Sequence, residues 1–511
     1  MIFAILESFS DFLVTSENVL MVASILLFLS ILAGKAGYKI GLPVLLLFMG
    51  VGMLMGSDGL GIKFSNPQTA QFIGVIALSI ILFSGGMDTK YSSIRPVLGQ
   101  GIVLSTLGVL FTALLTGSFI WFLTSVILGG HRAFTFPESM LLASVMASTD
   151  SATVFSLLRS RGLHIDKRLR STLELESGSN DPMAYVLTII CISIIQQSSS
   201  DFSSAFSQFC VQMVLGGALG FAFGKIAVFI INKINIENTS FYSILLLSLV
   251  TFCFSVTDKL NGNGYLAVYV AGLIVGNAKI VHKHSITTFF DGFTWLWQIV
   301  MFLTLGLLVE PHQLLDIVWI AVAIAAFLML LGRPLSVLLC LLPFKMRFKE
   351  KLYICWVGLK GAVPVIFATY PLIDGIEKSH IIFNIVFFIT ILSFIFQGST
   401  VAYAAKKLGL IQDSGLDGTE FGVELSEDIK STMSEIVVVP EMLENGSMLM
   451  EMKLPENTLV VMVKRGGNFF VPQGNTSLQA GDKLLLISDN ADALEKIYKK
   501  YNIESYTVEK S

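Results

Sequence analysis

The sequence predicts an all-α polytopic membrane protein that ends in a small α+β domain. Of its 511 residues, 54% are hydrophobic and only 14% are charged, a balance far more apolar than that of soluble domains. Apolar runs of lipid-spanning length follow one another up to about residue 402, and short strands bounded by turns come after them. The net charge of -3 gives no reason to expect a nucleic-acid partner.

Hydropathy predicts about thirteen transmembrane helices. Their approximate bounds are 18–36, 41–57, 68–87, 96–127, 138–158, 171–196, 205–232, 240–257, 264–277, 288–309, 313–342, 351–370 and 380–402. Basic residues gather in alternate loops, and the densest group is Arg159, Arg161, Lys167, Arg168 and Arg170. By the positive-inside rule, we expect the N-terminus outside and the C-terminal domain in the cytoplasm. Because the first basic residue, Lys35, follows the first apolar run, we expect no cleaved signal peptide.

The arrangement of spans predicts inverted repeats. Thirteen spans can be divided into six spans, one linker span and six more. Each helix of the second set then follows its counterpart by seven spans, and an odd offset inverts its topology. The fifth span would then match the twelfth, which contains the sequence Gly358-Leu359-Lys360-Gly361-Ala362-Val363-Pro364. Two glycines and a proline in one lipid-length segment are typical of a broken helix. We therefore expect broken helices that cross near the membrane midplane.

Two acids are predicted to lie at the same depth. Asp150 precedes Arg159 by nine residues, and Asp181 follows Arg170 by eleven. At 1.5 Å per residue, both acids lie about 13–17 Å from the cytoplasmic face, near the middle of a hydrocarbon core about 30 Å thick. Carboxylates inside membrane spans are costly and usually functional. The sequence therefore predicts an ion site at Asp150 and Asp181.

The sixth predicted span presents two polar faces. Ser177 and Asp181 are four residues apart on one face, and Glu176 and Asn180 share a second face. Lys360, nine residues after Lys351 in the twelfth span, is also near mid-depth. We therefore predict a structural ion pair between Glu176 and Lys360.

The other charged and sulfur-bearing residues of the spans are predicted to be structural. Arg333 and Lys225 are near the ends of their spans, where a long basic side chain can reach the interface. The cysteines fall in apolar segments without metal-ligand spacing, and we interpret them as small core residues: Cys191, Cys210, Cys253, Cys340 and Cys355. We expect neither a resident metal nor a cofactor.

The chain after the last span changes character. The membrane domain is predicted over 1–410, a linker over 411–433 and the α+β domain over 434–505. Expected strands are at 435–440, 458–464, 469–472 and 483–488, with a closing helix at 491–500. The tail has no phosphate-binding glycine loop and no nucleophile with a base, so we expect no enzyme.

Several motifs resemble the NhaP-type monovalent cation/proton antiporters. In the membrane part they occupy 147–155, 174–183, 302–309 and 358–364, and the likeness extends to 42–48 and 56–59. The tail is similar to the C-terminal subdomain of regulator-of-potassium-conductance modules (TrkA-C or RCK-C type), whose plainest signature here is Leu478-Gln479-Ala480-Gly481-Asp482. The pairing of the two parts is similar to the branch that exchanges potassium for protons.

This resemblance implies an NhaA-like antiporter fold and assigns roles to the polar residues. Asp181 would be the principal ion-binding carboxylate and Asp150 its partner. Further oxygens would come from Thr149, Ser177 and Asn180. Glu176 would pair with the basic residue of the twelfth span and hold the core together. The family also implies a homodimer, and the Asn180-Asp181 pair implies electroneutral one-for-one exchange.

Three residues depart from the family pattern. Ser151 stands where proline usually follows Thr-Asp, which softens the break in the fifth span. Lys360 stands where arginine is usual, and a lysine keeps the charge but loses the bidentate fork. Ser84 stands where many members have an acid, so a ligand from the third span is doubtful.

Together these features predict a secondary transporter of the bacterial inner membrane. The resemblance implies exchange of potassium for protons, in pH homeostasis and cell volume regulation. The residues themselves predict competition, because the same carboxylates bind either a proton or, when deprotonated, a cation. Exchange of sodium or lithium for protons is the alternative. A ligand-gated cation channel is a distant alternative, since the chain has no Thr-Val-Gly-Tyr-Gly-like filter. A small-molecule regulator of the C-terminal domain is a further partner that the sequence leaves open.

Overall fold

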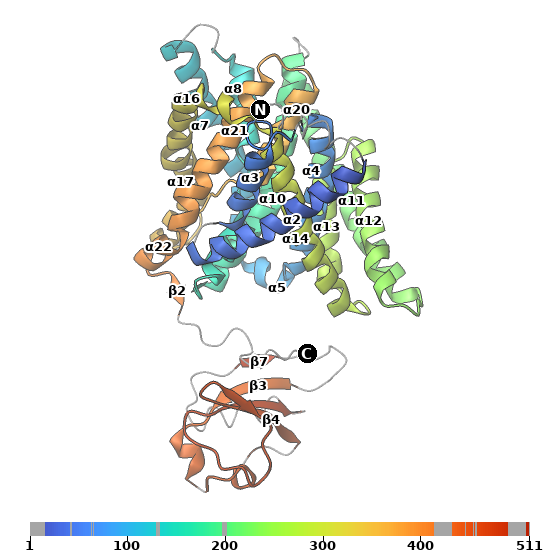
Figure 1. The fold of residues 1–511 in the computed structure, drawn as a ribbon, viewed down its shortest axis with the longest axis vertical. Helices are drawn as coiled ribbons and strands as arrows, with labels where there is room; N and C mark the ends of the chain where they lie inside the picture. Colours follow the sequence, from blue (N-terminus) through green and yellow to red (C-terminus); the bar gives the residue numbers. More distant parts are fainter. Residues whose placement is uncertain are drawn as a thin grey trace, which may run out of the picture. The chain divides into compact units, whose positions relative to one another are not determined.

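The chain forms two compact units, Met1–Ile411 and Gln412–Ser511, which are described separately. The computed structural model describes residues 16–40, 43–62, 64, 66–128, 133–196, 202–412, 432–444, 446–452, 454, 457–488 and 507–509. The first unit is a bundle of long helices, and the second is a small sheet domain (Figure 1).

Helices build nearly all of the first unit. The α-helices of its first half are α2 (Ser16–Ile40), α3 (Val44–Met55), α4 (Pro67–Asp88), α5 (Tyr91–Ile94), α6 (Leu98–Val103), α7 (Val109–Trp121), α8 (Phe136–Val145), α9 (Ser151–Arg159), α10 (Lys167–Gln196) and α11 (Phe202–Lys233). Those of the second half are α12 (Ser240–Lys259), α13 (Gly264–Gly276), α14 (Lys283–Leu308), α15 (Pro311–Leu315), α16 (Val318–Phe327), α17 (Arg333–Leu341), α18 (Phe348–Trp356), α19 (Ala362–Phe367), α20 (Thr369–Ile373), α21 (Ser379–Ser393) and α22 (Ser399–Leu408). Short 3₁₀ or π segments join some of them: η1 (Arg95–Val97), η2 (Leu104–Gly108), η3 (Phe122–Leu128), η5 (Leu328–Gly332) and η6 (Phe394–Gly398).

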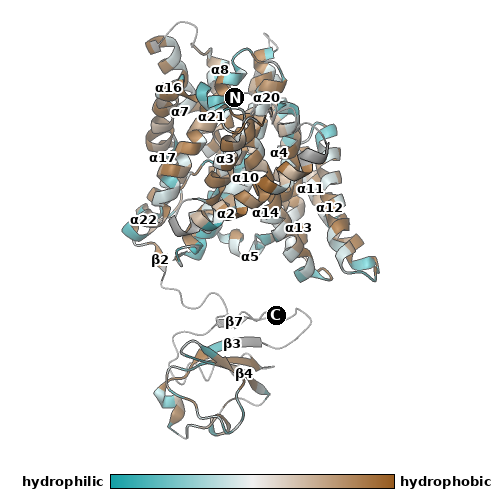
Figure 2. Ribbon diagram, viewed as in Figure 1, coloured by the Kyte–Doolittle hydropathy of each residue, from teal (hydrophilic) through white to brown (hydrophobic). Residues whose placement is uncertain are grey.

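Nine of these helical segments, counted over the described residues, are long and apolar enough to cross a membrane. The predicted spans 41–57, 138–158, 264–277 and 351–370 correspond instead to shorter or interrupted helices. Hydrophobic residues predominate along the helices of the first unit (Figure 2), and large apolar side chains such as Trp319 and Leu54 are more than 70% exposed. An outer surface of this kind is suited to lipid, because water would make it an aggregation site.

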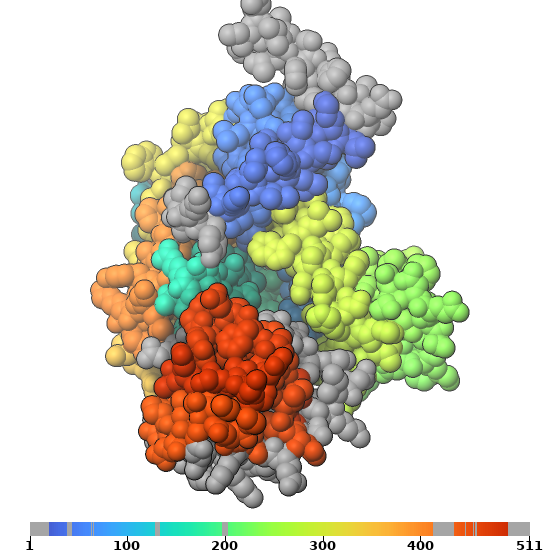
Figure 3. All heavy atoms as spheres, turned by 60° about the horizontal axis from the view of Figure 1, so that its bottom comes forward, coloured from blue at the N-terminus to red at the C-terminus, as the bar shows by residue number. Residues whose placement is uncertain are grey.

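Helix α10 lies in the interior of the bundle (Figure 1), where its main neighbours are α8, α6 and η2. Helices α11 and α12 form one edge of the unit, and α16, α17 and α22 lie toward the opposite edge (Figure 3). Helices α4 and α13 pack with their backbones almost in contact. A Cβ atom on Gly272 would lie 2.3 Å from the Phe83 carbonyl oxygen, so only glycine allows this approach.

The second unit is an antiparallel sheet with the strand order β5-β4-β6-β3-β7. The strands are β3 (Thr432–Val437), β4 (Thr458–Arg465), β5 (Asn468–Phe470), β6 (Lys483–Ser488) and β7 (Thr507–Glu509). Two residue pairs, His164–Ile165 (β1) and Ile411–Gln412 (β2), form a separate short ladder. The sheet buries Ile436, Val463 and Leu484, and the predicted helix at 491–500 lies outside the described residues.

A bidentate ion pair fixes the turn before β6. The Arg465 Nε and Nη2 atoms donate to the two Asp482 carboxylate oxygens at 2.8 and 2.7 Å. Asp482 also accepts from the Gln479 amide at 2.8 Å. The Arg465 hydrogen bonds hold the pKa of the Asp482 carboxyl below its usual range. Asp482 is therefore a structural element of the tail.

Candidate ion-binding site

Two helix breaks cross in the middle of the bundle. Residues Met146–Asp150 separate α8 from α9, and Val357–Gly361 separate α18 from α19. Both breaks were predicted from the sequence, and both are present. The Asp150 amide donates to the Leu359 carbonyl at 2.8 Å, so each break satisfies part of the backbone that the other leaves without a helical partner.

Asp150 ends the first break by capping α9. Its carboxylate accepts from the Thr153 amide at 3.0 Å and from the Thr153 hydroxyl at 2.6 Å. This is an ordinary N-cap, and it ties the acid to the first turn of the helix. On the other side of Asp150 lies Gly361, where an added Cβ atom would be 2.6 Å from the carboxylate.

We expect Gly361→Ala to reduce both exchange activity and stability. The new methyl group would force the crossed segments apart, and overpacking of this kind costs about 1–3 kcal/mol. The melting temperature in detergent and the rate of cation-driven proton movement in vesicles would measure the two effects. Gly217→Ala on α11 is the control, because its Cβ atom would meet nothing within 4 Å. Equal behaviour of the two variants would contradict this account of the crossing.

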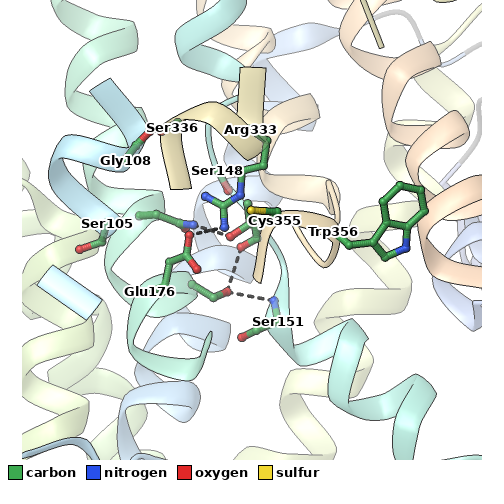
Figure 4. A network of polar contacts seen from close by, with 12 residues as sticks. Ser105, Gly108, Ser148, Ser151, Glu176, Arg333, Ser336, Cys355 and Trp356 are labelled. Atoms are coloured by element: carbon green, nitrogen blue, oxygen red, sulfur yellow. Dashed lines mark hydrogen bonds and ion pairs between the residues drawn. The ribbon is translucent and has the colours of Figure 1, made fainter. Parts of the chain in front are cut away.

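Helix α10 holds the first break in place through two side chains. The Ser177 hydroxyl donates to the Thr149 carbonyl at 2.9 Å and accepts from the Ser151 amide at 3.1 Å, a bridge that Figure 4 shows at Ser151. The Asn180 side-chain amide donates to the Thr149 hydroxyl at 2.6 Å. Ser177 thus replaces the helical partners that the break removes, and Asn180 orients Thr149.

Asp181 lies beside the same break. Its carboxylate accepts from the Ser148 hydroxyl, and the Ser148 carbonyl accepts from the Lys360 ammonium at 2.9 Å. Asp181 and Lys360 are 6% and 2% exposed. Ser148 therefore connects the Asp181 carboxylate of α10 to the Lys360 ammonium in the second break.

A cavity of about 380 Å³ leads to both acids. Its inner wall includes Thr149, Asp150, Ser177 and Asp181. Its other end carries charged residues from three helices: Asp88, Arg159, Arg170 and Glu174. Water and carboxylate oxygens can therefore coordinate a cation along the cavity, from the basic end of α10 to its middle.

The predicted Glu176–Lys360 ion pair is wrong. Glu176 pairs instead with Arg333 of α17, and both side chains are at most 3% exposed (Figure 4). The π-helical segment η5 immediately precedes Arg333 and places it inside the bundle, so the prediction that Arg333 reaches the membrane interface is also wrong. A guanidinium is better suited than an ammonium to a buried pair with a carboxylate.

The structure brings most of the predicted site residues together. Asp150, Asp181, Thr149 and Ser177 line the cavity, whereas the residues described as lining it do not include Asn180. Ser84 is buried in α4 and is likewise outside this lining.

Sequence patterns do not identify three kinds of residue in this region. Arg333 is expected at an interface, and no pattern indicates a role for Ser148 or Asp88. At the cavity mouth, Arg159 and Arg170 are predicted only as cytoplasmic loop residues. For Arg333 the available signal was the buried acid Glu176, which needs a counter-charge. For Ser148 it was the position two residues before Asp150 in an interrupted span.

Comparison with known proteins agrees with this geometry. Residues 23–407 match the family model "Sodium/hydrogen exchanger, transmembrane", and residues 434–500 match the TrkA-C domain. The chain is 39% identical over 482 residues to the K(+)/H(+) antiporter NhaP of Alkalimonas amylolytica, covering 93% of this chain and 81% of that one. It is 36% identical over 491 residues to the K(+)/H(+) antiporter NhaP2 of Shewanella sp. (strain MR-4), covering 94% and 83%.

A solved structure shows the same fold. The sodium proton antiporter MjNhaP1 from Methanocaldococcus jannaschii, at pH 8, superposes with a TM-score of 0.67 and 25% sequence identity, over 76% of this chain and 98% of that one. The resemblance seen in the motifs is thus confirmed for both parts of the chain. The first unit therefore has the fold of a helical membrane antiporter, and the chain belongs to the transmembrane sodium/hydrogen exchanger family.

Proposed function

We propose that the protein exchanges potassium for protons, one for one, at Asp150 and Asp181. As a member of an exchanger family the chain is a transporter and not an enzyme. The observation that carries the proposal is the cavity that leads from a charged mouth to two carboxylates beside crossed helix breaks. Relatives that share most of the chain's length are named K(+)/H(+) antiporters.

The chemistry follows from the side chains that face the cavity. A dehydrated alkali cation needs hard oxygen ligands, which Asp181, Asp150, Thr149 and Ser177 supply at one place. Asn180 is not among the residues described as lining the cavity, but its Oδ1 atom is buried without a hydrogen-bond partner among the described residues, so it is a further candidate ligand. A carboxylate that has taken up a proton loses its charge and no longer holds the cation. Proton and cation therefore compete for one site.

Alternating access would turn this competition into exchange. The two crossed breaks support a core of inverted repeats, in a membrane domain of about thirteen spans. This core would rock only when the site holds a proton or a cation. The basic residues at the cavity mouth support a cytoplasmic opening, with the N-terminus outside and the tail inside. By family analogy the protein acts as a homodimer in the bacterial inner membrane.

Sodium/proton exchange is the second candidate. It is favoured by the solved neighbour, which is a sodium proton antiporter. Everted vesicles with a preset pH gradient, challenged in turn with potassium, sodium and lithium salts, would report both exchange and ion preference. If potassium releases protons at a lower salt concentration than sodium or lithium does, the first candidate is supported. If only sodium or lithium releases protons, the second candidate is supported.

The tail is proposed to regulate transport and not to perform it. Its match to the TrkA-C domain supports binding of a small-molecule regulator. We expect a chain that stops after Gly409, the residue that caps α22, to insert and exchange ions with an altered dependence on pH or on the regulator. Exchange in vesicles at several pH values would measure this. Complete loss of transport in a well-inserted truncated protein would contradict a purely regulatory tail.

A further inference from the structure

A second polar cavity lies on the far side of Asp181. Its volume is about 540 Å³, and it is formed by the second half of α10, the first turns of α11 and the end of α12. Its lining begins at Tyr185, one turn beyond Asp181, and continues to Ile194, about 20 Å along the helix from Asp181. The cavity that reaches Asp150 opens at the other end of α10. The two cavities thus approach the ion site from opposite ends of one helix.

Gln212, on α11, is one of the polar residues that line this second cavity. Gln212 is only 7% exposed, and its Oε1 atom has no hydrogen-bond partner among the described residues. The Gln212 carbonyl accepts from the Asn263 amide at 3.0 Å, and the Asn263 side chain donates to the Pro182 carbonyl at 2.8 Å, next to Asp181. These hydrogen bonds fix Gln212 relative to α10, whereas its Oε1 atom makes no hydrogen bond to the described residues.

Asp258 supplies the charge. It lies in the last turn of α12, lines the same cavity and is exposed to it. Its carboxylate lies close to the Tyr185 hydroxyl. One carboxylate and one unpartnered amide oxygen in a polar cavity are ligands suited to a partly hydrated alkali cation, and a site of this size leaves room for water.

A cluster of aromatic rings separates the second cavity from Asp181. The Tyr185 ring centroid lies 5.0 Å from that of Tyr265, 5.5 Å from that of Tyr370 and 5.8 Å from that of Phe367. The hydroxyls of Tyr265 and Tyr370 are 3.2 Å apart. Tyr185 lines the cavity, and Tyr265 is close enough to Asp181 to interact with it electrostatically. The four rings therefore pack together between a residue of the cavity lining, Tyr185, and the surroundings of Asp181.

We propose that the second cavity is the outer vestibule of the transport route, and that Asp258 and Gln212 bind the transported monovalent cation there, behind the closed aromatic cluster. This inference rests on the proposed exchange at Asp150 and Asp181, and it adds a second, outer cation site. Neither Asp258 nor Gln212 takes part in the proton step.

The test compares the two faces of the membrane. Potassium dependence would be measured in right-side-out vesicles, for the outer face, and in everted vesicles, for the cytoplasmic face. We expect Asp258→Asn to raise the outer apparent KM for potassium about three- to tenfold, because it removes the charge that attracts the cation from the described lining of the cavity. Gln212→Leu should raise the same constant by a smaller factor. The cytoplasmic KM and the maximal rate should stay at wild-type values for both.

Asp374→Asn is the matched control. Asp374 is at the same end of the bundle, since its carbonyl accepts from the side chain of Gln196 at the end of α10, but it does not line the cavity. It should leave both constants unchanged. The inference is overturned if Asp258→Asn and Gln212→Leu leave the outer KM unchanged, if they alter both faces equally, or if Asp374→Asn has the same effect. Wild-type vesicles that exchange no cation would overturn the proposed function instead, before any variant is compared.

Discussion

Asp181→Asn is expected to reduce exchange to background in a protein that still folds and inserts. Asparagine keeps the shape of the side chain and can still accept the hydrogen bond from the Ser148 hydroxyl. What it loses is the charge that binds the cation and the group that carries the proton. Cation-driven proton release in everted vesicles would measure activity, and size-exclusion chromatography in detergent would measure folding. Ser84→Ala is the control, because Ser84 is equally buried but lies outside the cavity lining.

Asp150→Asn should have nearly the same effect on exchange. Asparagine is a good N-cap, so it can still accept from the Thr153 amide and keep α9 in place. Loss of activity without loss of folding would therefore report the missing charge and not a broken cap. If Asp150→Asn exchanged ions at the wild-type rate, Asp181 alone would form the site.

Competition gives a quantitative form of the same prediction. Below the apparent pKa of the carboxylate pair, each unit fall in pH should raise the apparent KM for the cation about tenfold, if one proton is displaced by one cation. The maximal rate should change much less. A KM that stays constant from about pH 6 to 8 while the rate changes would mean that proton and cation use separate sites. The shared-carboxylate mechanism would then be wrong.

The sequence was sufficient to predict the helix breaks and the acids between them. An acid in a lipid-length segment, such as Asp150, is costly wherever the segment packs, so its presence alone is informative. Gly358, Gly361 and Pro364 are equally informative, because they weaken a helix in any environment. Such signals act locally and do not depend on which helices become neighbours.

The partner of Glu176 could not be predicted in the same way. Counting residues from a loop gives the depth of a residue in the membrane but not its position around the helix axis. Depth alone therefore allows Lys360 as the partner of Glu176. The π-helical segment at Leu328–Gly332 changes the rotation of the helix that carries Arg333. The aromatic cluster is a similar case, since Tyr185, Tyr265 and Tyr370 meet only through the packing of three helices.

The ion pair between Glu176 and Arg333 leads to the largest expected change in stability. Both side chains are buried in the core of the first unit, and Lys360 adds a second positive charge that interacts with both of them. Glu176→Gln would leave two cations without their shared counter-charge, at a cost of about 3–5 kcal/mol. We expect its melting temperature in detergent to fall by more than that of any single substitution at the cavity wall, while its apparent KM for the cation changes little.

A double-mutant comparison identifies the partner. Glu176→Gln combined with Arg333→Gln removes both charges of the pair, so the double variant should be more stable than the sum of the single effects predicts. Glu176→Gln combined with Lys360→Met should depart less from additivity, because the Lys360 ammonium interacts with Glu176 without a direct ion pair and donates instead to the Ser148 carbonyl. Melting temperatures of the five variants and the wild type in one detergent would give both comparisons. A stronger coupling of Glu176 to Lys360 than to Arg333 would restore the pairing expected from depth alone, and Arg333 would then have to be assigned another role in holding α17 against α10.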